Sequence, residues 1–154
     1  MNIELVRASL EDAEVIWKMQ RIAFAELLER YQDFDTNPGN EPLEKVQWRF
    51  SFPATYFYFI RVDGQNAGAI RVIDHHDDSP KKISPLFVLP QFQGKGIAQA
   101  AIREAERIHG SDNWCLDTIL QEKGNCHLYE KMGYRQTGET RVINDRLTLV
   151  LYKK

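Results

Sequence analysis

The sequence has few cysteines and no long apolar run, and both shortages exclude classes of protein. Only Cys115 and Cys126 occur in 154 residues, without metal-type spacing and too few for a disulfide framework. The longest apolar segment, around residues 56–60, is too short to span a bilayer, and residues 1–4 show no leader pattern. We therefore expect a cytoplasmic protein with no membrane partner.

An excess of charge of one sign is also missing. Lys and Arg number 20 against 22 Asp and Glu, which gives a net charge of -2 and a pI near 6.1. A nucleic-acid binder normally carries a strongly basic face, so no nucleic-acid partner is expected. The chain also has no internal repeat and no low-complexity tract. Its length fits a single domain over residues 1–154.

The spacing of apolar residues predicts a mixed α/β fold. Strands are expected at residues 3–6, 55–62, 67–73, about 83–88, 114–119, 134–143 and 146–152, and helices at 13–31, 43–49, 94–109 and 125–132. Hairpins separated by short turns favour antiparallel pairing, and the later strand-helix-strand order favours a right-handed crossover. The expected architecture is a mostly antiparallel sheet of about seven strands with helices on both faces.

Two glycines precede the helix at 94–109, in the sequence Gln93-Gly94-Lys95-Gly96-Ile97-Ala98. The segment lacks the hydroxyl residue of a P-loop and the third small residue of a dinucleotide fingerprint. It fits a helix start that binds a diphosphate through backbone N–H groups, because no bulky side chain blocks their approach. A glycine-rich turn used only for packing fits the pattern about as well.

Residues 86–98 resemble the acetyl-coenzyme A loop of the GNAT superfamily of N-acetyltransferases. The family pattern Gln/Arg-x-x-Gly-x-Gly/Ala falls on Gln93, Gly96 and Ala98, and residues 128–134 resemble the family's later Leu-Tyr-Glu-Lys-x-Gly-Phe/Tyr signature. The order of strands and helices also matches along nearly the whole chain. The resemblance implies a GNAT-like fold in which two splayed strands hold acetyl-coenzyme A.

The resemblance also implies roles for individual residues. Main-chain amides from Gln93, Gly94, Lys95, Gly96, Ile97 and Ala98 would hold the pyrophosphate, and the strand at Phe87 and Val88 would pair with the pantetheine arm. The Val88 N–H would donate to the thioester carbonyl, and the Tyr129 phenol would act as general acid to the leaving thiolate.

Tyr129 and Asn125 each fit two roles. Tyr129 would serve equally as a packing residue on its short helix. Asn125 would either contact the cofactor or cap the helix, and the position where the family often has Asn is here Glu122.

No residue stands out as the general base. Asp74, His75, His76 and Glu26 are candidates, and water is another. The adjacent acids and histidines that follow residue 74 are more typical of a solvated loop than of a metal site, so no metal is expected. His109 fits a favourable charge at a helix C-terminus.

The resemblance implies that the segment between the first two helices, at residues 24–45, contacts the acceptor. It holds six acids against two bases: Glu26, Glu29, Asp33, Asp35, Glu41 and Glu44 against Arg30 and Lys45. Such a surface suits a cationic amine, but ordinary surface charge on amphipathic helices accounts for it as well.

The sequence therefore predicts an acetyl-coenzyme A-dependent N-acetyltransferase that acts on a primary amine of a small molecule or peptide. Neither cysteine lies in a nucleophile motif, so direct transfer is expected. A non-catalytic acyl-coenzyme A-binding module or sensor of the same fold is the alternative. The exposed edge strands of the final hairpin predict a homodimer.

Overall fold

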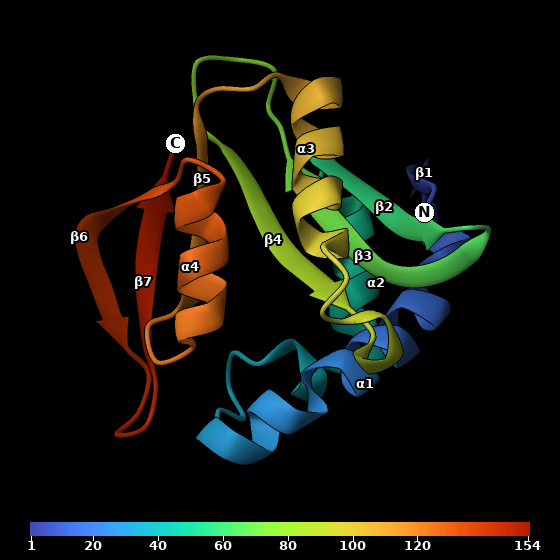
Figure 1. Cartoon of the computed structure of the whole chain (residues 1–154). Helices are drawn as coiled ribbons and strands as arrows, with labels where there is room; N and C mark the ends of the chain where they lie inside the picture. The colour runs from blue at the N-terminus through green and yellow to red at the C-terminus, as the bar shows by residue number, and fades with distance from the viewer.

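The computed structural model describes all residues from Met1 to Lys154 and contains a seven-stranded sheet with helices on both faces (Figure 1). The strand order in the sheet is β1-β2-β3-β4-β5-β7-β6. The strands are β1 (Ile3–Arg7), β2 (Thr55–Val62), β3 (Gln65–Ile73), β4 (Lys81–Val88), β5 (Trp114–Ile119), β6 (Arg135–Val142) and β7 (Thr148–Lys153). The helices are α1 (Ala13–Tyr31), α2 (Leu43–Ser51), α3 (Ile97–His109) and α4 (Lys123–Lys131). All neighbouring strands are antiparallel except β4 and β5, which confirms the predicted fold class.

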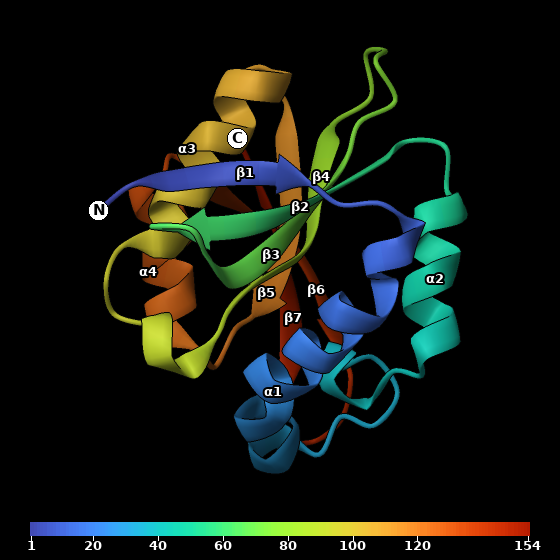
Figure 2. The same cartoon turned by 90° about the vertical axis from the view of Figure 1, so that its right-hand side faces the viewer.

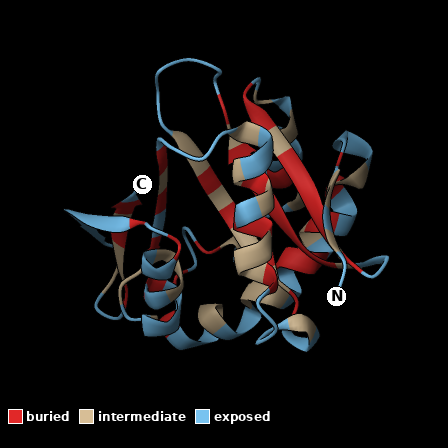
Figure 3. Cartoon of the chain, turned by 45° about the horizontal axis from the view of Figure 1, so that its top comes forward, coloured by how far each residue is buried: buried red, intermediate tan, exposed pale blue.

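Two hydrophobic cores lie on opposite faces of the sheet. Alternation along β2 divides that strand between them, because Tyr58 and Ile60 join one core while Phe57 and Phe59 join the other. Helix α3 packs on the first face, and α1 and α2 pack on the second, as Figure 2 shows. The buried residues in Figure 3 run along the central strands, where both faces are covered.

Strands β4 and β5 pair over only two residues before they part. Lys81 faces Trp114 and Lys82 faces Cys115, and no further pair follows. Strand β5 continues to pair with β7 as far as Ile119, so the separation lies on its β4 side (Figure 1). The backbone groups of β4 and β5 that face each other beyond this point therefore have no strand partner.

Two helices begin at different residues than predicted. Helix α3 begins at Ile97, because Gly94 and Gly96 each adopt a left-handed φ of 76° that breaks the helical path. Helix α4 begins at Lys123 with Glu122 at its N-cap, so Asn125 lies inside the first turn. The interpretation of Asn125 as the helix cap is therefore wrong.

Strand β6 forms one edge of the sheet, and all of its residues are exposed. Both cysteines are free thiols. None of the four helices is both long enough and apolar enough to cross a membrane.

Candidate active site

A cavity of about 650 Å³ lies beside the C-terminal end of β4, beyond the residues of β4 that pair with β5. It is lined from β4 and the following loop, from the first turn of α3, and from α1 and α4. Nine of the residues predicted to bind cofactor or act in catalysis line it: Phe87, Val88, Gln93, Gly94, Gly96, Ile97, Ala98, Asn125 and Tyr129. Lys95 does not line it, and its ammonium lies 5.8 Å from the centre of the Phe92 ring.

A row of unpaired backbone donors lies at the start of α3. The N–H groups of residues 94–99 donate none of the backbone hydrogen bonds of the structure, and the first helical bond there runs from the Ala100 N–H to the Gly96 carbonyl. A Cβ atom added at Gly94 or Gly96 would meet nothing within 4 Å. An anion can therefore approach these donors closely, and the positive end of the helix dipole adds to their attraction.

Gln93 ties this loop to the end of β4. Its side-chain Nε2 donates to the Val88 carbonyl at 3.0 Å, and its backbone N–H donates to the Pro90 carbonyl at 3.2 Å. The Gln93 N–H is thus already engaged, unlike those that follow it. The prediction that the Gln93 N–H holds the pyrophosphate is therefore wrong, because this N–H and the Gln93 side chain both fix the loop.

The Val88 N–H faces the gap between β4 and β5. Its neighbour Leu89 donates to the Ala67 carbonyl of β3 at 2.7 Å, and Val88 lies opposite Gly68 of the same strand. Successive N–H groups of a strand point to opposite sides, so the Val88 N–H points away from β3. It is a free donor at the cavity wall.

Tyr129 packs against the core and also lines the cavity. Its ring lies 6.1 Å from that of Tyr134 in an edge-on arrangement and packs against the core under α4. Its hydroxyl makes no hydrogen bond with the protein, and the residue lines the cavity. Burial raises the pKa of Tyr129 to about 12, so the phenol keeps its proton at neutral pH and is available as a donor.

A second cavity, of about 310 Å³, adjoins the first. The two share wall residues on α1, β4 and α4: Phe24, Leu27, Leu86, Asn125 and Tyr129. The second cavity extends from there between the loop after α1 and the strands β5, β6 and β7. Two molecules that entered the two cavities would therefore meet beside Tyr129 and Asn125.

A cluster that the sequence did not predict closes the first cavity beside α1. Glu122, before α4, accepts hydrogen bonds from the Arg30 guanidinium at 2.7 Å and from the Tyr31 hydroxyl. Arg30 also pairs with Glu26 at 2.7 Å. Glu122 and Tyr31 are 91 positions apart, so no local pattern could have indicated the contact.

Three of the four candidate bases lie away from both cavities. Asp74, His75 and His76 follow β3 at the end of the sheet opposite Val88, and none lines either cavity. Glu26 lines the first cavity, where it pairs with Arg30.

Asp74 instead belongs to a buried network with His109. The His109 Nδ1 lies 2.8 Å from Asp74 Oδ2, and its Nε2 lies 2.9 Å from the Tyr58 hydroxyl. The His109 side chain is only 3% exposed, so its interpretation as a charge at a helix end is wrong. Burial lowers the pKa of His109, against the opposing effect of Asp74. Burial alone would raise the pKa of Asp74, but hydrogen bonds from the His76 N–H and His109 lower it.

The acidic segment after α1 contributes little free negative charge to the site. Of its six acids, only Glu26 and Asp33 line a cavity. Glu26 is paired with Arg30, and Asp33 accepts from the Thr36 N–H at 2.9 Å. Glu41, outside both cavities, forms a half-buried ion pair with Arg49. Ordinary structural and surface charge therefore accounts for these acids better than a surface for a cationic amine does.

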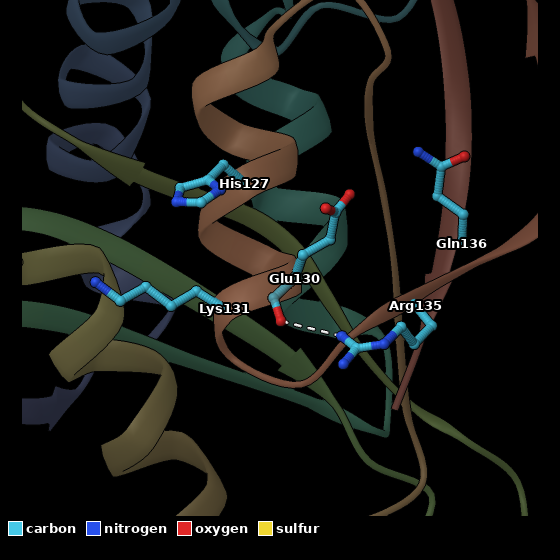
Figure 4. A pocket seen from close by; sticks show the side chains of 5 residues that line it. All are labelled: His127, Glu130, Lys131, Arg135 and Gln136. Carbon is cyan, nitrogen blue, oxygen red and sulfur yellow. Dashed lines mark hydrogen bonds between the residues drawn. The ribbon is translucent and has the colours of Figure 1, made fainter.

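The remaining large hollow is an open depression between α4 and β6 (Figure 4). It is lined by His127, Glu130, Lys131, Arg135 and Gln136, and by no hydrophobic residue. The Arg135 guanidinium donates to the Glu130 carbonyl at 3.1 Å within it. No group of three or more His, Cys, Asp or Glu side chains is placed to hold a metal ion.

The sequence of residues 53–136 matches the model of the acetyltransferase (GNAT) domain. The chain belongs to the GNAT family. The match includes β4, the donors at the start of α3, and Tyr129.

Curated relatives of this GNAT domain include N-acetylaspartate synthetases. The rat protein is 28% identical over 95 residues, which cover 60% of this chain and 32% of that protein. The zebrafish protein is 30% identical over 87 residues, which cover 54% of this chain and 31% of that protein. The chain thus matches about a third of the length of these relatives.

Solved structures share the fold at low sequence identity. One is a spermidine N-acetyltransferase from Vibrio cholerae in complex with CoA and spermine, with a TM-score of 0.75 and 16% sequence identity. The alignment covers 97% of this chain and 93% of the Vibrio chain. Another is a PaiA N-acetyltransferase from Thermoplasma acidophilum in complex with coenzyme A, with a TM-score of 0.67 and 18% sequence identity. That alignment covers both chains completely.

Proposed function

We propose that the protein is an acetyl-coenzyme A-dependent N-acetyltransferase that acts on a primary amine by direct transfer. The observation that carries this proposal is the row of free N–H groups at residues 94–99, which opens into the same cavity as the parted strand β4. The GNAT family membership supports it.

The residues present fit acetyl-coenzyme A at both of its polar parts. The donors at the start of α3 suit a pyrophosphate, since they are consecutive, unobstructed and at a helix N-terminus. The free edge of β4 at Phe87 and Val88 suits an amide-containing arm, which would replace the missing strand partner. When bound, acetyl-coenzyme A would supply an acetyl group activated as a thioester.

In the proposed reaction, a bond forms between the amine nitrogen and the acetyl carbon while the carbon–sulfur bond breaks. The Val88 N–H would donate to the carbonyl oxygen as it gains negative charge. The Tyr129 phenol, which keeps its proton because its pKa is raised to about 12, would donate that proton or a hydrogen bond to the leaving sulfur. Asn125, which lines both cavities, would contact the bound arm.

The amine must also lose a proton. The two acids that line the second cavity are already bound, Asp117 to Lys82 at 3.3 Å and Asp33 to Thr36. We therefore assign proton removal to water in that cavity.

A covalent route through cysteine is disfavoured. Neither Cys115 nor Cys126 lines either cavity. Burial raises the pKa of the Cys115 thiol, which makes it a poorer nucleophile at neutral pH.

The relatives suggest small acceptors of two kinds. The curated relatives are named for N-acetylaspartate, an acidic product, whereas one structural neighbour is a spermidine N-acetyltransferase, whose substrate is a polycation. Both are amines, and a primary amine of a small molecule or peptide is the acceptor proposed for this chain.

A thiol-release assay with acetyl-coenzyme A and a panel of amines tests the proposal. Tyr129→Phe should lower kcat by about 10²-fold or more while acetyl-coenzyme A affinity by calorimetry stays within about twofold. Tyr56→Phe is the matched control, because Tyr56 lines neither cavity and its hydroxyl contacts only His76. Tight binding of acetyl-coenzyme A with no thiol release for any amine would favour the non-catalytic sensor instead.

A homodimer formed through β6 stays a prediction, as does a location in the cytoplasm. The exposed edge of β6 supports the first of these. Sedimentation of the wild type against a variant with a proline in β6 would test it.

A further inference from the structure

The second cavity contains a cation without a partner. Arg141 lies on β6 opposite Leu149 of β7, and both line this cavity but not the first. Its guanidinium takes part in none of the ion pairs of the structure. The hairpin that carries Arg141 is held against α1 by the Asn144 side chain, which donates to the Tyr31 carbonyl at 3.0 Å.

A buried amide on another wall of the same cavity also has donors to spare. Asn37, in the loop after α1, is only 6% exposed. Its Oδ1 accepts from the Gly39 N–H at 2.7 Å, which fixes the orientation of the amide. Its Nδ2 makes no hydrogen bond with the protein, and this atom is accessible to solvent. A buried amide that lines a cavity and has unpaired N–H groups suits an acceptor of hydrogen bonds there.

The acids of this cavity already have partners, so the polar groups of its wall that lack partners are hydrogen-bond donors. Asp33 is 4% exposed and accepts from the N–H groups of Asp35 at 3.2 Å and Thr36 at 2.9 Å and from the Thr36 hydroxyl. Asp117 is paired with Lys82 at 3.3 Å. The cavity therefore suits a ligand with an anionic group more than one with a further cationic group.

We propose that the acceptor is a small amine that also carries a carboxylate, and that Arg141 and Asn37 bind this carboxylate. The inference rests on the proposed acetyl transfer and names the acceptor class of that site. A cavity of about 310 Å³ is at the small end of ligand sites, which favours a single amino acid over a peptide. The amine would lie beside Tyr129, on the wall shared with the first cavity, and the carboxylate would lie at the β6 wall.

Matched amines test the proposal on the wild-type protein. Glycine, L-aspartate and L-glutamate are compared with their α-carboxamides, and L-aspartate is also compared with a tripeptide that begins with Asp. We expect kcat/KM to be at least about tenfold higher for a free amino acid than for its amide. The amide's amine is the less basic of the two and is deprotonated more readily, so this preference cannot come from amine reactivity. Equal use of the tripeptide would show that the α-carboxylate beside the amine is not required, and would overturn the assignment to free amino acids.

Arg141→Gln tests the residue, and Arg146→Gln is its control on the same hairpin. Arg146 does not line the cavity, so its substitution removes the same charge from the same region without touching the site. Arg141→Gln should raise KM for the amino acid about tenfold, leave kcat and the amide's kinetics nearly unchanged, and leave acetyl-coenzyme A affinity unchanged. Arg141→Lys should recover part of the loss, since it keeps the charge but not the planar fork.

Different results would overturn the carboxylate-bearing acceptor and the proposed acetyl transfer. Acetylation of amines with no preference for a carboxylate, or an Arg141→Gln variant with wild-type KM, would overturn the inference and leave the acetyltransferase intact. The absence of acetyl transfer to every amine would overturn both.

Discussion

Gly68 allows β3 and β4 to approach closely beside the candidate active site. It lies opposite Val88, and a Cβ atom placed on it would lie 2.1 Å from the Phe87 carbonyl oxygen and 3.0 Å from the Val88 Cα. Its backbone does not adopt a positive φ, so the requirement for glycine here is one of space. Gly68→Ala should therefore push β4 away from β3.

The size of the displacement follows from these distances. A carbon and a carbonyl oxygen rarely approach closer than about 3.3 Å, so the two atoms must separate by roughly 1.2 Å. Overpacking of this kind costs about 1–3 kcal/mol of folding stability. A misplacement of about 1 Å in a reacting group costs about 10²-fold in rate, and the displaced backbone carries the Val88 N–H.

Two measurements separate the effect on the site from the effect on stability. Acetyl-coenzyme A affinity by calorimetry should fall about tenfold or more in Gly68→Ala, because the free edge of β4 moves, and this measurement needs no knowledge of the acceptor. Val72→Ala is the matched control, since Val72 is fully buried in the same strand but pairs with Ile83 away from Val88. It should lose about 2 kcal/mol of stability and keep wild-type affinity.

The proposed displacement of β4 is refuted if Gly68→Ala keeps both the thermal midpoint and the acetyl-coenzyme A affinity of the wild type. Equal losses of acetyl-coenzyme A affinity in Gly68→Ala and Val72→Ala would also refute it. The loss of affinity would then result from the lower folding stability and not from the position of β4.

Three other predictions concern single groups. Gly96→Ala forces a left-handed residue at the start of α3, at a cost of about 1–2 kcal/mol, so acetyl-coenzyme A affinity by calorimetry should fall about tenfold. Tyr129 should contribute no limb to the pH profile of kcat from about pH 6 to about pH 10, because its pKa is raised to about 12; a limb that vanishes in Tyr129→Phe would contradict this. The pKa of His109 is lowered in the folded protein, so the unfolded chain binds a proton more readily than the folded protein does. The stability that the neutral His109 contributes is therefore complete above pH 6.5, the ordinary pKa of histidine, and is lost as the pH falls below 6.5. Urea unfolding should show this loss, at most about 1.4 kcal/mol per pH unit, in the wild type and not in His109→Gln.

Patterns within short stretches of sequence predicted most of the fold. Alternation in β2 and β3, and the helical spacing over α1 and α3, depend on neighbours a few residues away, which a sequence displays directly. The start of α3 was predicted three residues early, because the sequence does not reveal that both Gly94 and Gly96 take the left-handed conformation.

Contacts between distant residues account for what the sequence did not predict. His109 was interpreted as a charge at a helix C-terminus because its partners, Tyr58 and Asp74, lie 51 and 35 positions away. The same holds for Glu122, which reaches Arg30 across 92 positions. A side chain's burial is decided by which strands become neighbours, and local periodicity carries no record of that.

The free donors of this protein are divided between the walls of the two cavities. The first cavity has those at the start of α3 and the Val88 N–H, the second has Asn37 and Arg141, and Tyr129 lies on the shared wall. Because Tyr129 lies on the wall that both cavities share, a change in the gap itself must affect the binding of both molecules. Arg141 lines only the second cavity, so we expect its loss to weaken the binding of a carboxylate-bearing acceptor and to leave acetyl-coenzyme A affinity unchanged. The contrast between Gly68→Ala and Arg141→Gln, measured with such an acceptor, therefore tests the division of the site into two cavities.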